Sequence, residues 1–232
     1  MKNKWRIIPT SLTGLNLGCG FVAILFVFSE KSITAGWLIV LAGILDGIDG
    51  WFARTSKANG RFGVEIDSLA DMVSFGVAPA LLVYSHNFYA WKIWGILLCF
   101  LLSACAAFRL ARFNVEAFED QHFRGFSGLP APMAAITMVS FFFLIKAVKI
   151  QKSGYALLPL LILVCILMVS RVQYDTFPYF TFRHSITNTI KLLFFILCVA
   201  MIIAFWRFTF FPVMITYLLH GPVFWLLKYV KT

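Results

Sequence analysis

Long apolar stretches alternate with short polar segments along the whole chain, and the polar segments hold most of the charged residues. Because about 17 to 25 mainly apolar residues form a helix that crosses a bilayer, we expect each stretch to be one membrane span. The pattern predicts eight spans, at residues 11–28, 33–53, 67–84, 93–111, 130–147, 155–171, 190–206 and 208–227. Only residues 207–209 separate the last two, so a tight hairpin or a re-entrant pair fits there as well.

This pattern predicts an all-α protein, a polytopic transmembrane helix bundle with six core spans and two C-terminal spans. We expect residues 1–232 to form one integral membrane domain, with a core over 7–150 and additional helices over 151–232. The composition agrees, since 61% of the residues are hydrophobic and 13% are charged, whereas soluble domains have about 25% charged residues. No clean small-residue cleavage site follows the basic N-terminal segment, so we expect an uncleaved first span and no signal peptide.

The net charge of +10 would suggest a nucleic-acid partner for a soluble protein. Here the basic residues lie in short segments between spans, and the positive-inside rule explains them more simply. With the N-terminus in the cytoplasm, 14 of the 20 Lys and Arg residues lie on the cytoplasmic side. We therefore expect a multi-pass protein of the bacterial inner membrane, with membrane lipids and no nucleic acid as partners. Lys146, Lys149 and Lys152 are the exception, and we expect them to reach the headgroups by snorkelling.

Four aspartates interrupt the apolar pattern around the second and third spans. Asp46 and Asp49 are three residues apart near the end of the second span, and Asp67 and Asp71 are four apart near the start of the third. Each pair therefore shares one helix face. Because only the short polar segment 55–64 joins the two helices, we expect antiparallel neighbours whose ends meet at one membrane surface. The four carboxylates should converge just inside the cytoplasmic boundary.

Carboxylates gathered in this way need compensation, because burial and mutual repulsion both disfavour the ionised form. Oxygen ligands favour hard cations such as Mg²⁺, Mn²⁺ or Ca²⁺, and a pair of such ions grips phosphate chains. The acids alone fit a cation pathway in a transporter as well as they fit catalysis. Gly43, Gly47 and Gly50 let a ligand approach the second helix closely, and Arg54 offers a forked donor for phosphate. These residues favour catalysis on a phosphate-containing substrate.

The complete motif over 46–71 resembles the signature of the CDP-alcohol phosphotransferases. Its fixed positions are Asp46, Asp49, Gly50, Ala53, Arg54, Gly63, Asp67 and Asp71, and every gap between them matches. The resemblance implies membrane enzymes, typically homodimers, that move a phosphatidyl or similar group from a CDP-linked lipid to an alcohol and release CMP. It implies that the four aspartates bind two divalent ions, Mg²⁺ or Mn²⁺, and that Asp71 is also the catalytic base on the attacking hydroxyl. Gly50, Ala53, Arg54 and Gly63 would shape the CDP pocket.

Further stretches extend the resemblance. In "IIPTSLTGLNLGCGFVAI", Pro9, Thr13 and Asn16 match the opening of the family's first helix, whereas Thr10 stands where Asn is usual. The resemblance places Thr13 and Asn16 at the CDP-lipid. "FRLARFNVEAF" and "FRGFSGLPAPMAA" are similar to the phosphatidylserine synthase branch, although Met133 replaces a usually small residue.

Arg109, Arg112 and Asn114 lie in the first of these two stretches, where the fourth span ends. From the residues alone, positive-inside anchoring explains the arginines best. The alternative is that at least one arginine faces the acids and, with Asn114, holds the carboxylate of an amino-acid acceptor or a phosphate of the donor. The Gly-Leu-Pro-Ala-Pro run at 128–132 most simply ends a loop and begins a helix.

Together these features predict transfer of a phosphatidyl group from CDP-diacylglycerol to L-serine, giving phosphatidylserine and CMP in phospholipid biosynthesis. The nearest alternative is a member of the same family that uses glycerol 3-phosphate or an inositol phosphate as acceptor. A membrane cation transporter and a non-catalytic membrane scaffold are alternatives from other classes.

Overall fold

The computed structural model describes residues 4–56, 61–119, 126–150, 153–174 and 186–230. Within these ranges, side chains are described for 11–50, 62–116, 128–150, 153–172, 174, 201 and 204–225. Nearly all of the described chain is helical, which confirms the predicted all-α class.

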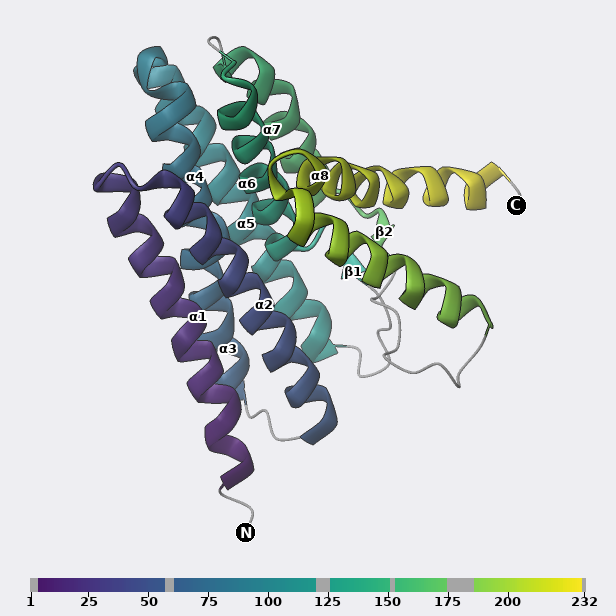
Figure 1. The fold of residues 1–232 in the computed structure, drawn as a ribbon. Coiled ribbons are helices and arrows are strands. Elements are labelled where there is room, and N and C mark those ends of the chain that lie inside the picture. The colour runs from purple at the N-terminus through teal and green to yellow at the C-terminus, as the bar shows by residue number, and fades with distance from the viewer. Residues whose placement is uncertain (1–3, 57–60, 120–125, 151–152, 175–185, 231–232) are drawn as a thin grey trace.

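A bundle of long helices forms the body of the protein (Figure 1). The helices are α1 (Lys4–Phe28), α2 (Ser32–Ser56), α3 (Arg61–Asp71), α4 (Ala78–Val83), α5 (Ile93–Glu119), α6 (Ala131–Val148), α7 (Ser153–Val169) and α8 (Ile186–Val230). The π-helical segment η1 (Met72–Val77) joins α3 to α4, and the π-helical segment η2 (Tyr84–Phe88) and the 3-10 turn η3 (Tyr89–Trp91) continue α4, so that these elements form one rod. Two short strands, β1 (Phe126–Ser127) and β2 (Gln173–Tyr174), pair antiparallel beside the bundle.

Six helical segments of the described chain are long and apolar enough to cross a membrane. They are Ser11–Phe28, Ser32–Gly50, Phe62–Trp91, Ile93–Glu116, Ala131–Val148 and Ala204–Trp225. The chain is therefore a multi-pass membrane protein, as predicted. The helix α7, at 17 residues, is apolar but slightly shorter.

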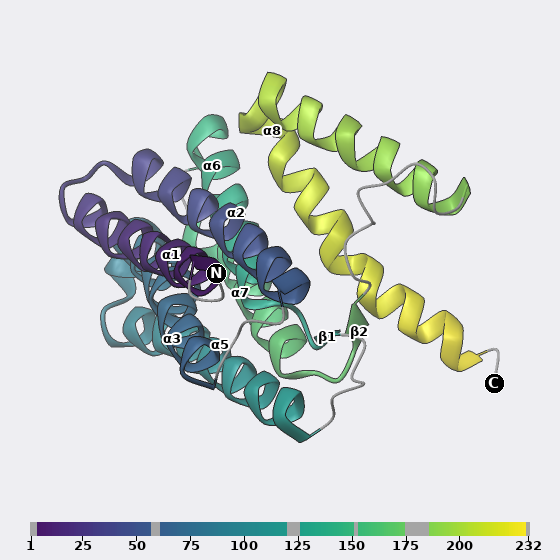
Figure 2. The same cartoon turned by 90° about the horizontal axis from the view of Figure 1, so that it is seen from below.

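The two C-terminal spans of the prediction are not confirmed. Residues 190–206 and 208–227 fall within α8, which consists of two helical limbs that meet at a kink at Phe205 (φ −134°, ψ 40°), and the second limb includes the apolar segment Ala204–Trp225. Both limbs of α8 run obliquely to the bundle helices instead of alongside them (Figures 1 and 2). The sequence pattern measures only length and hydropathy, and neither quantity fixes the direction in which a helix packs.

Close backbone contact holds α1 against the rod that carries Asp67 and Asp71. A Cβ atom at Gly20 would overlap the Ser74 hydroxyl and lie 2.8 Å from the Ser74 Cα. Ser74 also donates a hydrogen bond from its hydroxyl to the Asn16 carbonyl oxygen, at 2.9 Å. The absence of a side chain at Gly20 therefore sets the distance between α1 and the start of η1.

The run at 128–132 ends a loop and begins α6, as predicted. Gly128 has φ +84°, a left-handed conformation that favours glycine. Its N–H donates to the Val172 carbonyl at 2.9 Å, and the Leu129 N–H donates to the Leu167 carbonyl at 3.0 Å. Pro130 then caps the N-terminus of α6. These bonds tie the start of α6 to the end of α7.

We expect Gly20→Ala to lower the thermal unfolding midpoint, because the added methyl group forces α1 away from Ser74. Overpacking of this kind costs about 1 to 3 kcal/mol. Fluorescence-monitored melting of the detergent-solubilised protein measures the effect. Gly18→Ala is the matched control, since a Cβ there meets no atom within 4 Å, and it should not lower the midpoint. Equal losses for both variants would contradict the close approach at Gly20.

Candidate active site

The aspartates of the motif come together where α2 ends and α3 begins, at the lower end of the bundle in Figure 1. One carboxylate oxygen from each of Asp46, Asp67 and Asp71 lies within 4.8 Å of the other two. Asp49 joins them, because it interacts electrostatically with Asp67. Asp49 and Asp71 are each only 6% exposed. The antiparallel arrangement predicted from the short 55–64 connection therefore gathers all four acids.

Two polar residues of α1 orient the acids. The Thr13 hydroxyl donates a hydrogen bond to Asp49 Oδ2 at 2.7 Å, and Asn16 Nδ2 donates to Asp71 Oδ1 at 2.9 Å. Thr13 and Asn16 are three residues apart and share one face of α1. The family resemblance implied that both contact the CDP-lipid, which stays a prediction, and the structure shows the carboxylates as their partners. A neighbouring helix face thus fixes the side-chain conformations of Asp49 and Asp71.

The donor set fits a hard divalent cation. Asp49 Oδ1 and Asp67 Oδ1 are buried, and neither accepts a hydrogen bond from any described residue. A buried carboxylate oxygen without a donor is unfavourable unless a cation or a ligand satisfies it. The clustered ligand atoms are all carboxylate oxygens, which suit Mg²⁺ or Mn²⁺. The acidic cluster therefore has the composition and the unsatisfied oxygens of a metal centre.

Of the glycines of α2 that were expected to let a ligand approach, Gly47 leaves open space and Gly43 packs against α6. A Cβ atom at Gly47 would meet no other atom within 4 Å, whereas one at Gly43 would lie 2.9 Å from Ile136 of α6. Gly50 and Gly63 are partly buried. The side chains of Ala53 and Arg54 lie outside the described part of the structure, so their predicted contribution to a CDP pocket stays a prediction.

Arg109 on α5 faces the acids. Its side chain is only 5% exposed, and it interacts electrostatically with Asp71 and Asp46. The guanidinium carbon lies 5.3 Å from the ring centroid of Phe113, one turn further along the helix. Membrane anchoring, the interpretation that the residues alone favoured, is wrong for Arg109, because an anchoring arginine extends toward water and headgroups. This arginine supplies positive charge inside the site.

Arg112 contacts the end of α7. It donates to the carbonyl oxygens of Val169 at 2.8 Å and Ser170 at 3.0 Å, and its Nε lies 3.9 Å from a carboxylate oxygen of Glu116. A Cβ atom at Gly128 would lie 2.6 Å from the Arg112 guanidinium. Arg112 therefore caps a helix C-terminus, where a cation is favourable, and its predicted contact with substrate has no support in these bonds.

Asn114 lies near the acids together with Ser68 and Tyr217, which the sequence analysis did not single out. Asn114, predicted beside the acceptor, accepts a hydrogen bond at 3.1 Å from Ser68, which adjoins Asp67 on α3. Tyr217 on α8 interacts electrostatically with Arg109. The position of Ser68 inside the motif could have drawn attention to it, but Tyr217 lies more than a hundred residues from Arg109 in sequence and only packing brings it near.

The family model for CDP-alcohol phosphatidyltransferase matches residues 6–170, which include every aspartate of the cluster, Thr13, Asn16 and Arg109. The chain belongs to the CDP-alcohol phosphatidyltransferase family. The match ends at the C-terminus of α7, so α8 lies beyond the shared region.

Curated relatives of this CDP-alcohol phosphatidyltransferase include two serine O-phosphatidyltransferases and an archaetidylserine synthase. A CDP-diacylglycerol–serine O-phosphatidyltransferase from Helicobacter pylori is 33% identical over 75% of this chain and 74% of its own. One from Mycobacterium tuberculosis is 39% identical over 63% of this chain and 51% of its own. An archaetidylserine synthase from Methanothermobacter thermautotrophicus is 36% identical over 72% of this chain and 69% of its own. The family and these names identify a phosphatidyltransferase enzyme.

We expect Arg112→Gln to destabilise this phosphatidyltransferase by about 1 to 3 kcal/mol, because the α7 carbonyl oxygens lose a charged donor. The measurement is the thermal unfolding midpoint in detergent. Arg171→Gln, which removes an exposed arginine beside the same helix end, is the control and should leave the midpoint unchanged. An unchanged midpoint for Arg112→Gln, together with a raised KM for the acceptor, would show that Arg112 binds substrate instead.

Proposed function

We propose that the protein is a CDP-diacylglycerol–serine O-phosphatidyltransferase that makes phosphatidylserine and CMP. The observation that carries the proposal is the convergence of Asp46, Asp67 and Asp71 within 4.8 Å at one end of the bundle, with Arg109 beside them. Membership of the family supports the donor chemistry, and the names of the relatives support L-serine as the acceptor.

The donor would bind where the acids meet the open side of α2. The four aspartates would hold two divalent ions, Mg²⁺ or Mn²⁺, which neutralise diphosphate charge and stabilise the departing CMP. The open space beside Gly47 lets a ligand lie against the helix backbone. We propose that Gly50, Ala53, Arg54 and Gly63, which follow along the same motif, border the CDP group.

Asp71 would act as the general base. Asn16 occupies its Oδ1, and no described residue donates a hydrogen bond to Oδ2, which leaves that oxygen for the hydroxyl proton of serine. The serine oxygen forms a bond to the phosphorus of the phosphatidyl group, and the bond from that phosphorus to the bridging oxygen of CMP breaks. CMP leaves with the electron pair, and the proton passes to Asp71. A base held within hydrogen-bond reach accelerates such a step by about 100- to 10,000-fold.

Arg109 would orient the acceptor. It is buried, charged and adjacent to Asp71, so a carboxylate bound to its guanidinium brings the serine hydroxyl close to the base. A carboxylate pairs well with the two parallel N–H groups of an arginine. The ring of Phe113 lies against the guanidinium group, with its centroid 5.3 Å from the guanidinium carbon. Arg109 is thus the best candidate for recognition of an amino-acid acceptor.

The orientation and assembly are part of the same proposal. We place the acids on the cytoplasmic side of a bacterial inner membrane, because most basic residues lie at that end of the spans. A homodimer follows from the family resemblance. Labelling of single cysteines from each side of sealed vesicles tests the orientation, and mass measurement of the detergent complex tests the dimer.

An acceptor panel tests the substrate assignment. Purified protein with CDP-diacylglycerol should release CMP with L-serine and release little with glycerol 3-phosphate or an inositol phosphate, because a phosphorylated acceptor carries more negative charge and calls for a larger basic cluster than Arg109 provides beside the acids. The measurement is CMP formation with identification of the lipid product. Release with a phosphorylated acceptor alone would assign a different member of the family. Metal flux into liposomes without CMP release would favour the transporter.

We expect Asp71→Asn to lower turnover by at least about 100-fold, because the amide cannot accept the hydroxyl proton. Part of the CDP-lipid affinity should survive, since the other three acids remain. CMP release and equilibrium binding of CDP-diacylglycerol measure the two effects. Glu65→Gln is the control, because Glu65 is an exposed acid on the same helix, and it should keep its activity. Full activity of Asp71→Asn, or of protein treated with a chelator, would contradict the proposed chemistry.

A further inference from the structure

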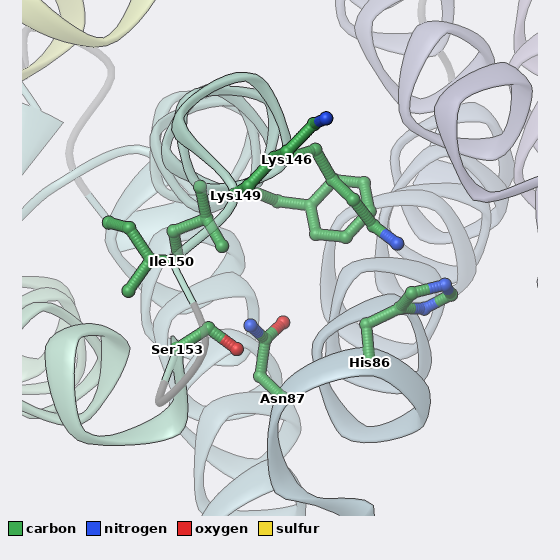
Figure 3. A pocket seen from close by; sticks show the side chains of 8 residues that line it. His86, Asn87, Lys146, Lys149, Ile150 and Ser153 are labelled. Carbon is green, nitrogen blue, oxygen red and sulfur yellow. The ribbon is translucent and has the colours of Figure 1, made fainter.

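A second polar site lies at the end of the bundle opposite the acids. A cavity of about 310 Å³ opens between η2, the C-terminal end of α6 and the start of α7 (Figure 3). Its lining residues are His86, Asn87, Phe142, Ile145, Lys146, Lys149, Ile150 and Ser153. It includes two of the three lysines that run against the positive-inside pattern, and the third, Lys152, lies outside the described residues. Their position suggests a role beyond topology.

The cationic side of the cavity is built around Lys146. Its ammonium group lies 5.7 Å from the ring centroid of Phe142, and the side chain extends toward His86 (Figure 3). Among the described residues, neither Lys146 nor Lys149 forms an ion pair. Glu30 is the acidic residue near this wall, where it interacts electrostatically with His86. The cavity therefore has two lysines available for an anion.

His86 forms a fixed wall of the cavity. Its Nε2 lies 2.6 Å from the Ser32 hydroxyl and its Nδ1 lies 2.8 Å from the Ser85 hydroxyl. Its ring meets Phe142 edge-on, with centroids 5.3 Å apart. Because both ring nitrogens have partners, His86 shapes the cavity and the lysines supply its charge.

Asn87 supplies an unsatisfied acceptor. Its side chain is only 8% exposed, and its Oδ1 accepts no hydrogen bond from any described residue. The side chain lines the cavity beside Ser153 (Figure 3). A buried amide oxygen without a donor is unfavourable, and a ligand with an O–H or N–H group would satisfy it. The cavity thus combines positive charge with a separate hydrogen-bond acceptor.

We propose that this cavity binds the headgroup of an anionic glycerophospholipid in the leaflet opposite the acidic cluster. Lys146 and Lys149 hold the phosphodiester, and Asn87 accepts a hydrogen bond from a hydroxyl or ammonium group of the headgroup. Phe142, Ile145 and Ile150 contact the apolar part that follows. The cavity lies where the membrane-crossing segment of α6 ends, at Val148, which is the depth of lipid headgroups. A lipid is therefore favoured over a soluble phosphate ester.

Lipid titration of the detergent-purified full chain, followed by native mass spectrometry, tests the proposal. The probe is phosphatidylglycerol, with phosphatidylcholine as reference. The double variant Lys146→Gln/Lys149→Gln should bind phosphatidylglycerol more weakly by about five-fold for each lysine, the usual contribution of a basic residue near anionic lipid. Lys92→Gln removes an exposed lysine that does not line the cavity, so its affinity should equal that of the unaltered chain. Equal affinity in the double variant, or an equal loss in Lys92→Gln, overturns the proposal.

Two further experiments test whether Asn87 binds the headgroup and whether the bound phosphate belongs to a lipid. Asn87→Ala should reduce the preference for phosphatidylglycerol over phosphatidylmethanol, whose headgroup has no donor, and an unchanged preference overturns the role of Asn87. Soluble glycerol 3-phosphate should not displace the bound lipid, and efficient displacement overturns the assignment to a lipid. Binding is compared only for variants whose thermal unfolding midpoint equals that of the unaltered chain. If Asn87→Ala does not fold, Asn87→Asp serves instead, and it should lower phosphatidylglycerol affinity by repelling the phosphate.

Discussion

Mutual repulsion among four carboxylates is the constraint around which this end of the bundle is built. Asp49 and Asp71 are nearly inaccessible to solvent, and burial next to like charge is unfavourable. The surrounding helices supply partial compensation through Thr13, Asn16 and Arg109. The unsatisfied oxygens of Asp49 and Asp67 mark the part of the charge that the described protein leaves for cations. The site is thus arranged to be completed by ligands that carry positive charge.

A chain of hydrogen bonds connects this chemistry to the packing of the bundle. Ser74 binds the Asn16 carbonyl, and the Asn16 side chain binds Asp71. The chain exists because α1 lies against η1 without a side chain at Gly20. Backbone contact and carboxylate orientation are therefore coupled, and a change in helix spacing would move the proposed base. The orientation of the clustered carboxylates therefore depends on a small residue, Gly20, which packs against Ser74.

The two ends of the bundle differ in charge and in the ligands they suit. The acidic end gathers oxygen ligands and one buried arginine, which suits a nucleotide-linked lipid with bound cations. The opposite end presents lysines and an amide oxygen around a cavity of about 310 Å³, which suits the phosphodiester of a lipid headgroup. In the two proposals, one helix bundle therefore carries a site at each of its ends. Because α8 runs obliquely, Tyr217 lies near Arg109. The helix α8 itself lies beyond residues 6–170, which the family model matches.

The sequence by itself determined the helical class, most of the membrane segments and the convergence of the aspartates, because these depend on hydropathy, helical spacing and a short connection. It did not determine which helix face each motif meets. Arg109 and Arg112 are three residues apart, yet one faces the acids and the other caps α7. Thr13 and Asn16 bind the carboxylates, which the sequence did not indicate, and their expected contact with the CDP-lipid stays a prediction. Periodicity states which residues share a face, whereas the neighbour that covers that face, and the direction of α8, follow from packing across the whole fold.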